Sequence, residues 1–161
     1  QLCARPQVCK MEDDAKPFYE KIMEADAVVI GTPVYIDNIT ATVRAFIERF
    51  YGYRHVDIQI AGKPFVTVVT GAMMTDSAVE EFHKMLGMFD IDVIDTVTFT
   101  SKVPPCFKCG RHKECKIGGA YMMLGDAAKE LTITKEMFTR WEDDSTTVAA
   151  IDAAAENLKK I

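Results

Sequence analysis

Short apolar runs alternate with longer amphipathic stretches through the first hundred residues of this chain. The runs cover residues 27–30, 65–70 and 92–99, and the first two are rich in β-branched side chains. The stretches between them are long enough for the crossover connections that parallel strands require. The alternation therefore predicts an α/β fold with a doubly wound parallel sheet, organised as a single domain over residues 1–161.

Predicted helices flank these strands, because apolar residues recur there at helical spacing. Asp13 and Asp14 offer side-chain oxygens that can cap the first helix. Asn38 can cap the second helix, Ser77 the third and Ser145 the last. Helices on either side of a sheet complete the expected two-sided architecture.

The composition of the chain limits which binding partners and which cellular compartment we expect for the protein. The formal net charge is −5, which argues against a general affinity for nucleic acid or for an anionic membrane. No apolar run approaches the roughly 20 residues of a membrane-spanning helix. The start shows no basic segment followed by an apolar stretch, which would mark a secretory signal. We therefore expect a cytoplasmic protein.

Two turns after predicted strands carry groups that suit a ligand. The strand at 27–30 is expected to be buried on both faces and to end at Gly31-Thr32-Pro33-Val34-Tyr35. The strand at 65–70 is followed by Gly71, which lets backbone approach a ligand closely. Backbone groups, a hydroxyl and the Tyr35 ring suit a flat heteroaromatic ligand. The alternative is that both segments only end strands.

A second candidate site is the cysteine-rich loop over residues 102–119. Its possible metal ligands recur at every third residue. They are Cys106, Cys109, His112 and Cys115. Such a set can wrap a tetrahedral Zn²⁺, or it can give three thiolates to an iron–sulfur cluster. Basic neighbours at 108, 111 and 113 would offset thiolate charge. Free thiols, or one local disulfide, remain the alternative.

Cys3 and Cys9 form a separate pair near the start of the sequence. Two cysteines at this spacing near a terminus are weak evidence by themselves. The total of five cysteines is odd, and clustered cysteines in an intracellular protein favour metal binding or redox chemistry over a disulfide framework.

One continuous stretch carries a resemblance to a known family. From Cys9 to Tyr35 the chain reads CKMEDDAKPFYEKIMEADAVVIGTPVY, and ATVRAFIER follows shortly after. This stretch strongly resembles the NADPH-dependent FMN reductase and iron–sulfur flavoprotein family, whose fold is flavodoxin-like. The resemblance is dense over residues 3–71 and continues more loosely to the C-terminus.

The resemblance implies that this sequence contains some of the residues of the family's cofactor sites. In iron–sulfur flavoproteins a C-x2-C-x2-C motif is followed by a fourth cysteine, and Cys3 and Cys9 match its third and fourth positions. The first strand and the phosphate loop would precede Gln1, so the chain looks like the C-terminal two-thirds or more of the domain. The positions that the resemblance assigns to FMN are Thr32, Pro33, Val34, Tyr35, Asn38, Thr70 and Gly71. The cysteine-rich loop near the C-terminal third is an insertion outside that motif.

The resemblance also implies a function. We expect an FMN-dependent oxidoreductase that passes electrons from NAD(P)H or a protein donor to an iron–sulfur centre, of the [4Fe–4S] type, or to another acceptor. Relatives form homodimers or homotetramers. No catalytic residue is identified. Two alternatives stay open: an electron-transfer protein with no substrate of its own, and a non-catalytic module in which the cysteine-rich loop is a structural zinc knuckle.

Overall fold

The computed structural model describes residues 9–72 and 74–161. Strands and helices alternate up to residue 100, in the order α1 (Lys16–Glu24), β1 (Val28–Tyr35), β2 (Asn38–Ile39), α2 (Ala41–Glu48), β3 (Pro64–Gly71), α3 (Thr75–Gly87) and β4 (Asp92–Thr100). A 3₁₀ helix, η1 (Arg49–Tyr53), extends α2. After β4 come α4 (Cys106–Cys109), α5 (Gly119–Leu124), three short 3₁₀ turns and α6 (Ser145–Leu158).

The sheet has the order β2-β1-β3-β4. β1 pairs in parallel with β3, and β3 with β4, while β2 is a two-residue antiparallel strand joined to β1 by a tight hairpin. Successive parallel strands that lie side by side have the order of the last three strands of a flavodoxin-like sheet. The predicted α/β architecture with a mostly parallel sheet is confirmed.

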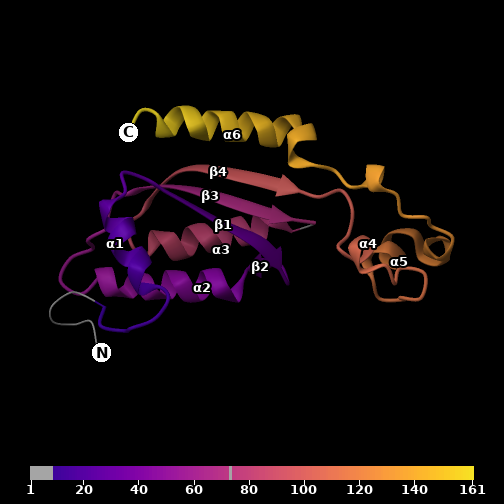
Figure 1. Ribbon diagram of the computed structural model, residues 1–161, viewed down its shortest axis with the longest axis horizontal. Coiled ribbons are helices and arrows are strands. Elements are labelled where there is room, and N and C mark those ends of the chain that lie inside the picture. The colour runs from indigo at the N-terminus through magenta and orange to yellow at the C-terminus, as the bar shows by residue number, and fades with distance from the viewer. Residues whose placement is uncertain (1–8, 73) are drawn as a thin grey trace.

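Helices cover both faces of the sheet, as Figure 1 shows. The main core lies between the sheet and helices α2 and α3, and its fully buried side chains include Phe50, Phe65, Phe82 and Leu86. A smaller cluster of Val66, Val97 and Ala154 packs α6 on the opposite face. Apolar burial of this kind stabilises the layers by about 25 cal/mol per Å².

The strand β1 differs from its prediction in two ways. It runs through the Gly-Thr-Pro segment to Tyr35, because Gly31 still pairs with Val68 and Pro33 with Thr70. Its residues alternate between buried and exposed, and Val29 is 60% exposed. The prediction of burial on both faces is wrong for this strand, since the α6 cluster covers β3 and β4 instead.

Several predicted helix caps are also wrong. Thr40 caps α2, accepting a hydrogen bond from the Val43 N–H, and Asn38 lies two residues earlier, in β2. Asp144 caps α6 through Thr146 and Thr147. Helix α3 begins two residues before Ser77, and Ala15 occupies the cap of α1 without a side-chain bond.

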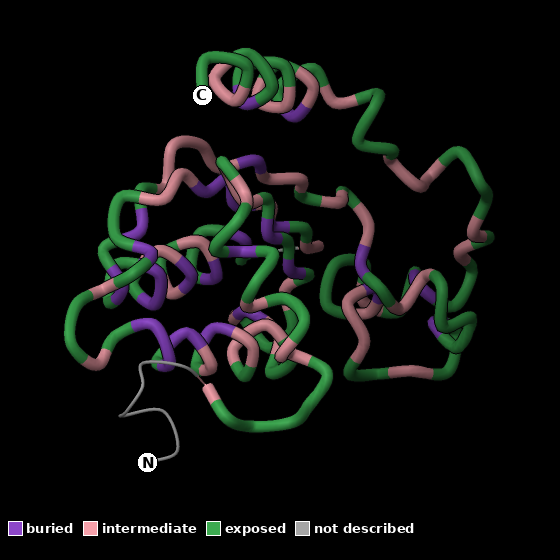
Figure 2. Tube along the Cα trace, turned by 60° about the vertical axis from the view of Figure 1, so that its left-hand side comes forward, coloured by how far each residue is buried: buried purple, intermediate pink, exposed green. Residues whose placement is uncertain are grey.

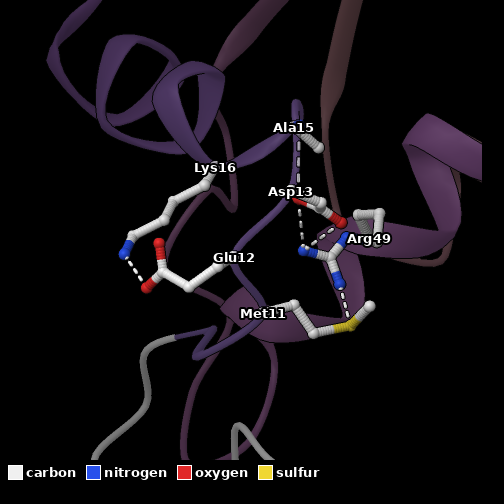
Figure 3. Close-up of polar contacts among 6 residues, drawn as sticks. All are labelled: Met11, Glu12, Asp13, Ala15, Lys16 and Arg49. Atoms are coloured by element: carbon white, nitrogen blue, oxygen red, sulfur yellow. Dashed lines mark hydrogen bonds and ion pairs between the residues drawn. The ribbon is translucent and has the colours of Figure 1, made fainter.

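The predicted cap Asp13 instead ties the segment before α1 to the end of α2. Its carboxylate lies 3.1 Å from Arg49 Nη2, and it also accepts the Ala15 N–H. Arg49 contacts the Met11 sulfur as well, and Lys16 pairs with Glu12 (Figure 3). The chain from Met11 onward is thereby fastened to the helical layer.

Residues 101–144 form a long connection between β4 and α6 beyond the carboxyl ends of the parallel strands (Figure 1). Most of this connection is exposed or half-buried, and its buried residues are Pro104, His112, Ala120 and Ala128 (Figure 2). Within the described residues, no helix combines the length and the apolar character needed to cross a bilayer.

Candidate functional site

A pocket of about 450 Å³ opens where the three parallel strands end. Its walls come from the ends of β1, β3 and β4, from the first residues of the connection after β4, and from one distant aromatic residue. The lining residues are Pro33, Val34, Tyr35, Thr70, Gly71, Ala72, Phe99, Ser101, Val103, Pro104, Pro105, Lys108 and Phe138. Its size and mostly apolar walls are those of a small-molecule site.

Most of the predicted flavin-binding residues line this pocket, namely Pro33, Val34, Tyr35, Thr70 and Gly71. Thr32 does not, because its side chain is buried and its hydroxyl donates to the Pro33 carbonyl and accepts from the Thr40 N–H at 3.1 Å. Asn38 does not either, since its carbonyl oxygen accepts the Ile39 N–H. These two side chains hold the hairpin and the start of α2, so their predicted contact with a ligand stays a prediction.

Gly71 allows the ends of β1 and β3 to approach each other. A Cβ at this position would lie 3.0 Å from Val34 Cβ and 3.2 Å from Thr75 Cγ2. Contacts this short force a neighbour to shift. The absence of a side chain at Gly71 therefore allows β1 and β3 to pack closely. Together the ends of these two strands form the floor of the pocket.

The hairpin beside the pocket has a strained backbone. Ile36 and Asp37 both have positive φ values, 52° and 55°, as a two-residue turn of this type requires. Asparagine, aspartate and glycine tolerate this conformation, but a β-branched residue does not. Ile36 is also 98% exposed, so no burial compensates for the strain. Strain that packing does not explain is typical of functional segments.

About half of the residues that line this pocket are not predicted from the sequence. Phe99 and Ser101 lie at the end of β4, while Pro104, Lys108 and Phe138 lie in the connection that follows. The end of β4 could have been inferred, because carboxyl ends of parallel strands share one edge. Nothing in the local sequence marks Phe138, which only the path of the long connection brings to the pocket.

Three predicted metal ligands line a second pocket of about 390 Å³. Its residues are Cys106, Cys109, Arg111, Glu114 and Cys115. The Ala120 N–H donates to Cys106 Sγ at 3.2 Å. The Arg111 guanidinium has a raised pKa, chiefly because it bonds Glu114 at 3.1 Å, with smaller contributions from Cys109 and Cys115. The pocket thus combines three sulfurs with one arginine–glutamate ion pair.

The structure does not bring His112 to this pocket. Its ring is buried, its Nε2 lies 2.9 Å from the Leu131 carbonyl oxygen, and its Nδ1 has no hydrogen-bond partner. Over residues 9–72 and 74–161, no group of three or more His, Cys, Asp or Glu side chains is arranged to hold a metal ion. Cys3 lies outside the described residues.

Cys9 lies at the other end of the sheet. It lines a pocket of about 320 Å³ together with Tyr19, Gly52 and Tyr53, next to α1 and η1. Burial raises the pKa of the Tyr53 phenol, with smaller contributions from Tyr19 and Cys9. Cys9 and the Cys106 group therefore line separate pockets, and of these two only the Cys106 group adjoins the pocket at the carboxyl ends.

Several known proteins are similar to this chain. The chain is 37% identical over 70 residues to an iron–sulfur flavoprotein of Archaeoglobus fulgidus, covering 44% of this chain and 35% of that protein. It is 22% identical over 95 residues to an iron–sulfur flavoprotein of Methanosarcina thermophila, covering 57% of this chain and 50% of that protein. The chain thus spans half or less of the length of these relatives.

A solved structure, the Trp repressor binding protein from Bacillus subtilis, is similar at a TM-score of 0.48 and 17% identity. The match covers 77% of this chain and 73% of that one. Residues 1–108 match the family described as NADPH-dependent FMN reductase. That match spans most of the chain, including β1, β3, β4 and, within the connection, Cys106. This chain belongs to the NADPH-dependent FMN reductase family.

Proposed function

We propose that the chain binds FMN in the carboxyl-end pocket and works as an oxidoreductase, taking electrons from NAD(P)H or a protein donor. One observation carries the proposal: in a chain of the FMN reductase family, three parallel strands end at a single, largely apolar pocket. Ligands of open α/β sheets bind at such an edge. FMN, when bound, supplies the hydride and electron chemistry, while the protein supplies binding and orientation.

We expect the lining residues to contact different parts of the bound FMN. Tyr35 is 67% exposed and presents an aromatic ring on which a flat ring system can pack. Gly71 and Thr70 offer backbone and hydroxyl groups for the edge of that ring system. Lys108 is the charged residue among the lining side chains, and its ammonium group would stabilise negative charge on a bound, reduced ligand.

The proposal extends to an acceptor and to assembly. Cys9, together with Cys3, would provide two ligands of an iron–sulfur cluster, and the names of the archaeal relatives support the presence of such a cluster. Residues 102–119 would be a cysteine-rich insertion in the flavodoxin-like domain. The active form would be a homodimer or homotetramer.

The test is an FMN titration followed by flavin fluorescence, and then anaerobic NADPH oxidation with an artificial acceptor. Tyr35→Ala should weaken FMN binding about ten-fold, equivalent to about 1.4 kcal/mol. Tyr51→Ala is the matched control, because Tyr51 is also an exposed aromatic residue but lies in η1, away from the pocket. Equal losses in both variants, or no FMN binding by the wild-type protein, would sink the proposal.

The same measurements separate the alternatives. FMN binding without NADPH turnover would favour an electron-transfer protein reduced by a partner. Zinc without FMN or iron would favour a non-catalytic module with a structural zinc knuckle in the cysteine-rich loop.

A further inference from the structure

Two of the three cysteines in the connection after β4 hold their sulfur atoms close to a single backbone position. The position that a Gly118 Cβ would occupy lies 3.1 Å from Cys115 Sγ and 3.7 Å from Cys106 Sγ. The two sulfurs therefore cannot be farther apart than these two distances placed end to end. Cys109 supplies none of the three atoms nearest that position, and its side chain is exposed. The geometry thus singles out Cys106 and Cys115 as a pair.

The glycine at position 118 provides space and is not required by the backbone conformation. Its φ and ψ angles are −79° and 157°, which is an extended conformation that any residue adopts. A side chain there would crowd both sulfurs, because 3.1 Å is shorter than ordinary van der Waals contact. Gly118 therefore keeps open the space in which the sulfurs of Cys106 and Cys115 can meet.

A hydrogen bond fixes the direction of the Cys106 side chain. The Ala120 N–H donates to Cys106 Sγ at 3.2 Å, so this sulfur points from α4 toward the start of α5. Cys106 Sγ thus lies against residues 118–120, the segment that Cys115 Sγ also approaches. An N–H donor stabilises negative charge on the atom that accepts it, and the thiolate is the form of cysteine that attacks a disulfide.

The pair is accessible to a small molecule. Cys106 and Cys115 are half-buried and line a cavity of about 390 Å³. The other lining residues, Cys109, Arg111 and Glu114, are all exposed, so the cavity opens to solvent. Over residues 9–72 and 74–161, no three His, Cys, Asp or Glu side chains are arranged to hold a metal ion. A disulfide, in contrast, needs only two sulfurs that can approach each other.

We propose that Cys106 and Cys115 are a redox-active pair that exchanges with low-molecular-weight disulfides such as oxidised glutathione. The Cys106 thiolate attacks one sulfur of the small disulfide, releases one small thiol and forms a mixed disulfide. The Cys115 thiolate then attacks the Cys106 sulfur, forms the intramolecular S–S bond and releases the second small thiol. The two cysteines lose two electrons and two protons, which the two released thiols carry. An excess of the small thiol reverses both steps.

The disulfide would alter one wall of the carboxyl-end pocket, and this step alone rests on the proposed function. Oxidation brings the two sulfurs, which are free thiols in this structure, to about 2.05 Å and so ties the start of α4 to the turn before α5. Pro104 and Pro105 directly precede Cys106, and both line the carboxyl-end pocket together with Lys108. We therefore expect oxidation of the pair to change the affinity of this pocket for FMN.

The experiment maps the thiols of the full chain at equilibrium with mixtures of oxidised and reduced glutathione. Free thiols are alkylated with iodoacetamide, and the protein is cut with trypsin under non-reducing conditions. Cleavage after lysine and arginine places the three cysteines on separate peptides, residues 103–108, 109–111 and 114–116. We expect a disulfide that joins 103–108 to 114–116 and that disappears in excess reduced glutathione. A disulfide between 103–108 and 109–111 in its place, or three alkylated thiols in every mixture, would overturn the pair.

Matched variants test the two parts of the geometry. Cys109→Ser should keep the disulfide, whereas Cys106→Ser should abolish it. In Gly118→Ala free thiols can turn away from the new methyl group but linked sulfurs cannot, so the equilibrium constant for disulfide formation should fall about ten-fold. Gly87→Ala is the control, because a Cβ there meets nothing within 4 Å. Equal constants in the two glycine variants, or loss of the disulfide in Cys109→Ser, would contradict the proposed geometry.

The affinity for FMN is measured on the reduced and the oxidised wild-type chain. It should differ by about five-fold or more between the two forms, and Cys106→Ser should show no difference between the same two conditions. Equal affinities in the wild-type chain would overturn the effect on the pocket. A disulfide in a chain that binds no FMN would contradict the proposed function and leave the redox pair standing. FMN binding without the disulfide would do the reverse.

Discussion

The two cysteine regions lie at opposite ends of the sheet and are stabilised in different ways. Cys9 lies beside η1, against residues that belong to the main core. Cys106, Cys109 and Cys115 lie in a connection with few buried residues. From this difference we expect the amino end of the sheet to unfold together with the main core, and the connection at the carboxyl end to open locally at a lower free-energy cost.

Aromatic packing stabilises the amino end. Tyr53 is 3% exposed, and its hydroxyl donates to the Tyr19 carbonyl at 3.0 Å. The Tyr19 ring lies 4.6 Å from the Tyr53 ring, and Phe50 packs on the other side at 5.8 Å. Cys9 is therefore next to a rigid aromatic cluster, and small changes there affect the whole domain.

Glycine and proline contacts stabilise the carboxyl end instead. The position of a Gly119 Cβ lies 2.5 Å from Pro104 Cβ, so the start of α5 rests directly on Pro104. Pro104 also lines the pocket at the carboxyl ends of the strands. The contact between Gly119 and Pro104 thus connects the cysteine-rich segment to that pocket, and neither hydrophobic core of the described residues includes it.

The largest expected effect is a loss of folding stability when a core side chain near the amino end of the sheet is truncated. Phe50→Ala should lower the free energy of unfolding by about 3–5 kcal/mol, because it opens a cavity among fully buried rings. Phe50 is 1% exposed and contacts Phe46, Phe65 and Phe89. Urea denaturation followed by circular dichroism measures the change.

Phe107→Ala is the matched variant at the carboxyl end, since Phe107 is half-buried and contacts only the His112 ring among the described aromatic residues. We expect it to cost less than about 1 kcal/mol. Similar losses for the two phenylalanines would break the comparison, because the ends would then unfold as one unit.

An intermediate effect is expected at the contact between the two pockets. Gly119→Ala would force the start of α5 away from Pro104, which overpacks the site at a cost of about 1–3 kcal/mol. FMN affinity and amide hydrogen exchange over residues 101–125 should both change. Gly87→Ala is the control, because a Cβ there meets nothing within 4 Å and alanine favours the helix. Unchanged FMN affinity in Gly119→Ala would show that Pro104 does not transmit the shift.

The sequence predicted the architecture because its signals are local. The β-branched runs placed β1, β3 and β4 within a few residues, and helical spacing placed the covering helices. The end of β1 was wrong because Gly31 and Pro33 look like a stop, yet parallel pairing with β3 carries the strand through them. Pairing with a distant strand is a tertiary contact that local composition does not reveal.

The candidate site was only partly predictable for the same reason. Tyr35 and Gly71 are the last residues of β1 and β3, so topology places them at the edge where the pocket opens. Pro104, Lys108 and Phe138 reach the pocket through a long connection whose path depends on contacts such as that of Gly119. The sequence grouped His112 with the cysteines by spacing, but burial turns its ring toward Leu131. Spacing along a chain does not determine the direction of a side chain in an irregular loop.

The smallest expected effect tests whether the carboxyl end carries strain for the sake of a ligand. Ile36 has a φ of 52°, a backbone conformation that is unfavourable for a β-branched residue. Its side chain is 98% exposed, so hydrophobic burial does not offset this cost. Ile36→Asn should raise the free energy of unfolding by about 1 kcal/mol, because asparagine adopts the left-handed conformation more readily. Ile117→Asn, at an isoleucine that is 88% exposed and has no positive φ, should give no such gain.

The FMN affinity of the Ile36→Asn variant shows whether the strained hairpin at the carboxyl end of the sheet contributes to binding. A gain in stability joined to a loss of FMN affinity would mean that the strained hairpin is retained for binding, in keeping with the usual trade-off between stability and function. A gain in stability with unchanged affinity would make the strain incidental. A loss of stability would contradict the strain itself, because it would require Ile36 to make stabilising contacts that a 98% exposed side chain does not have within this chain.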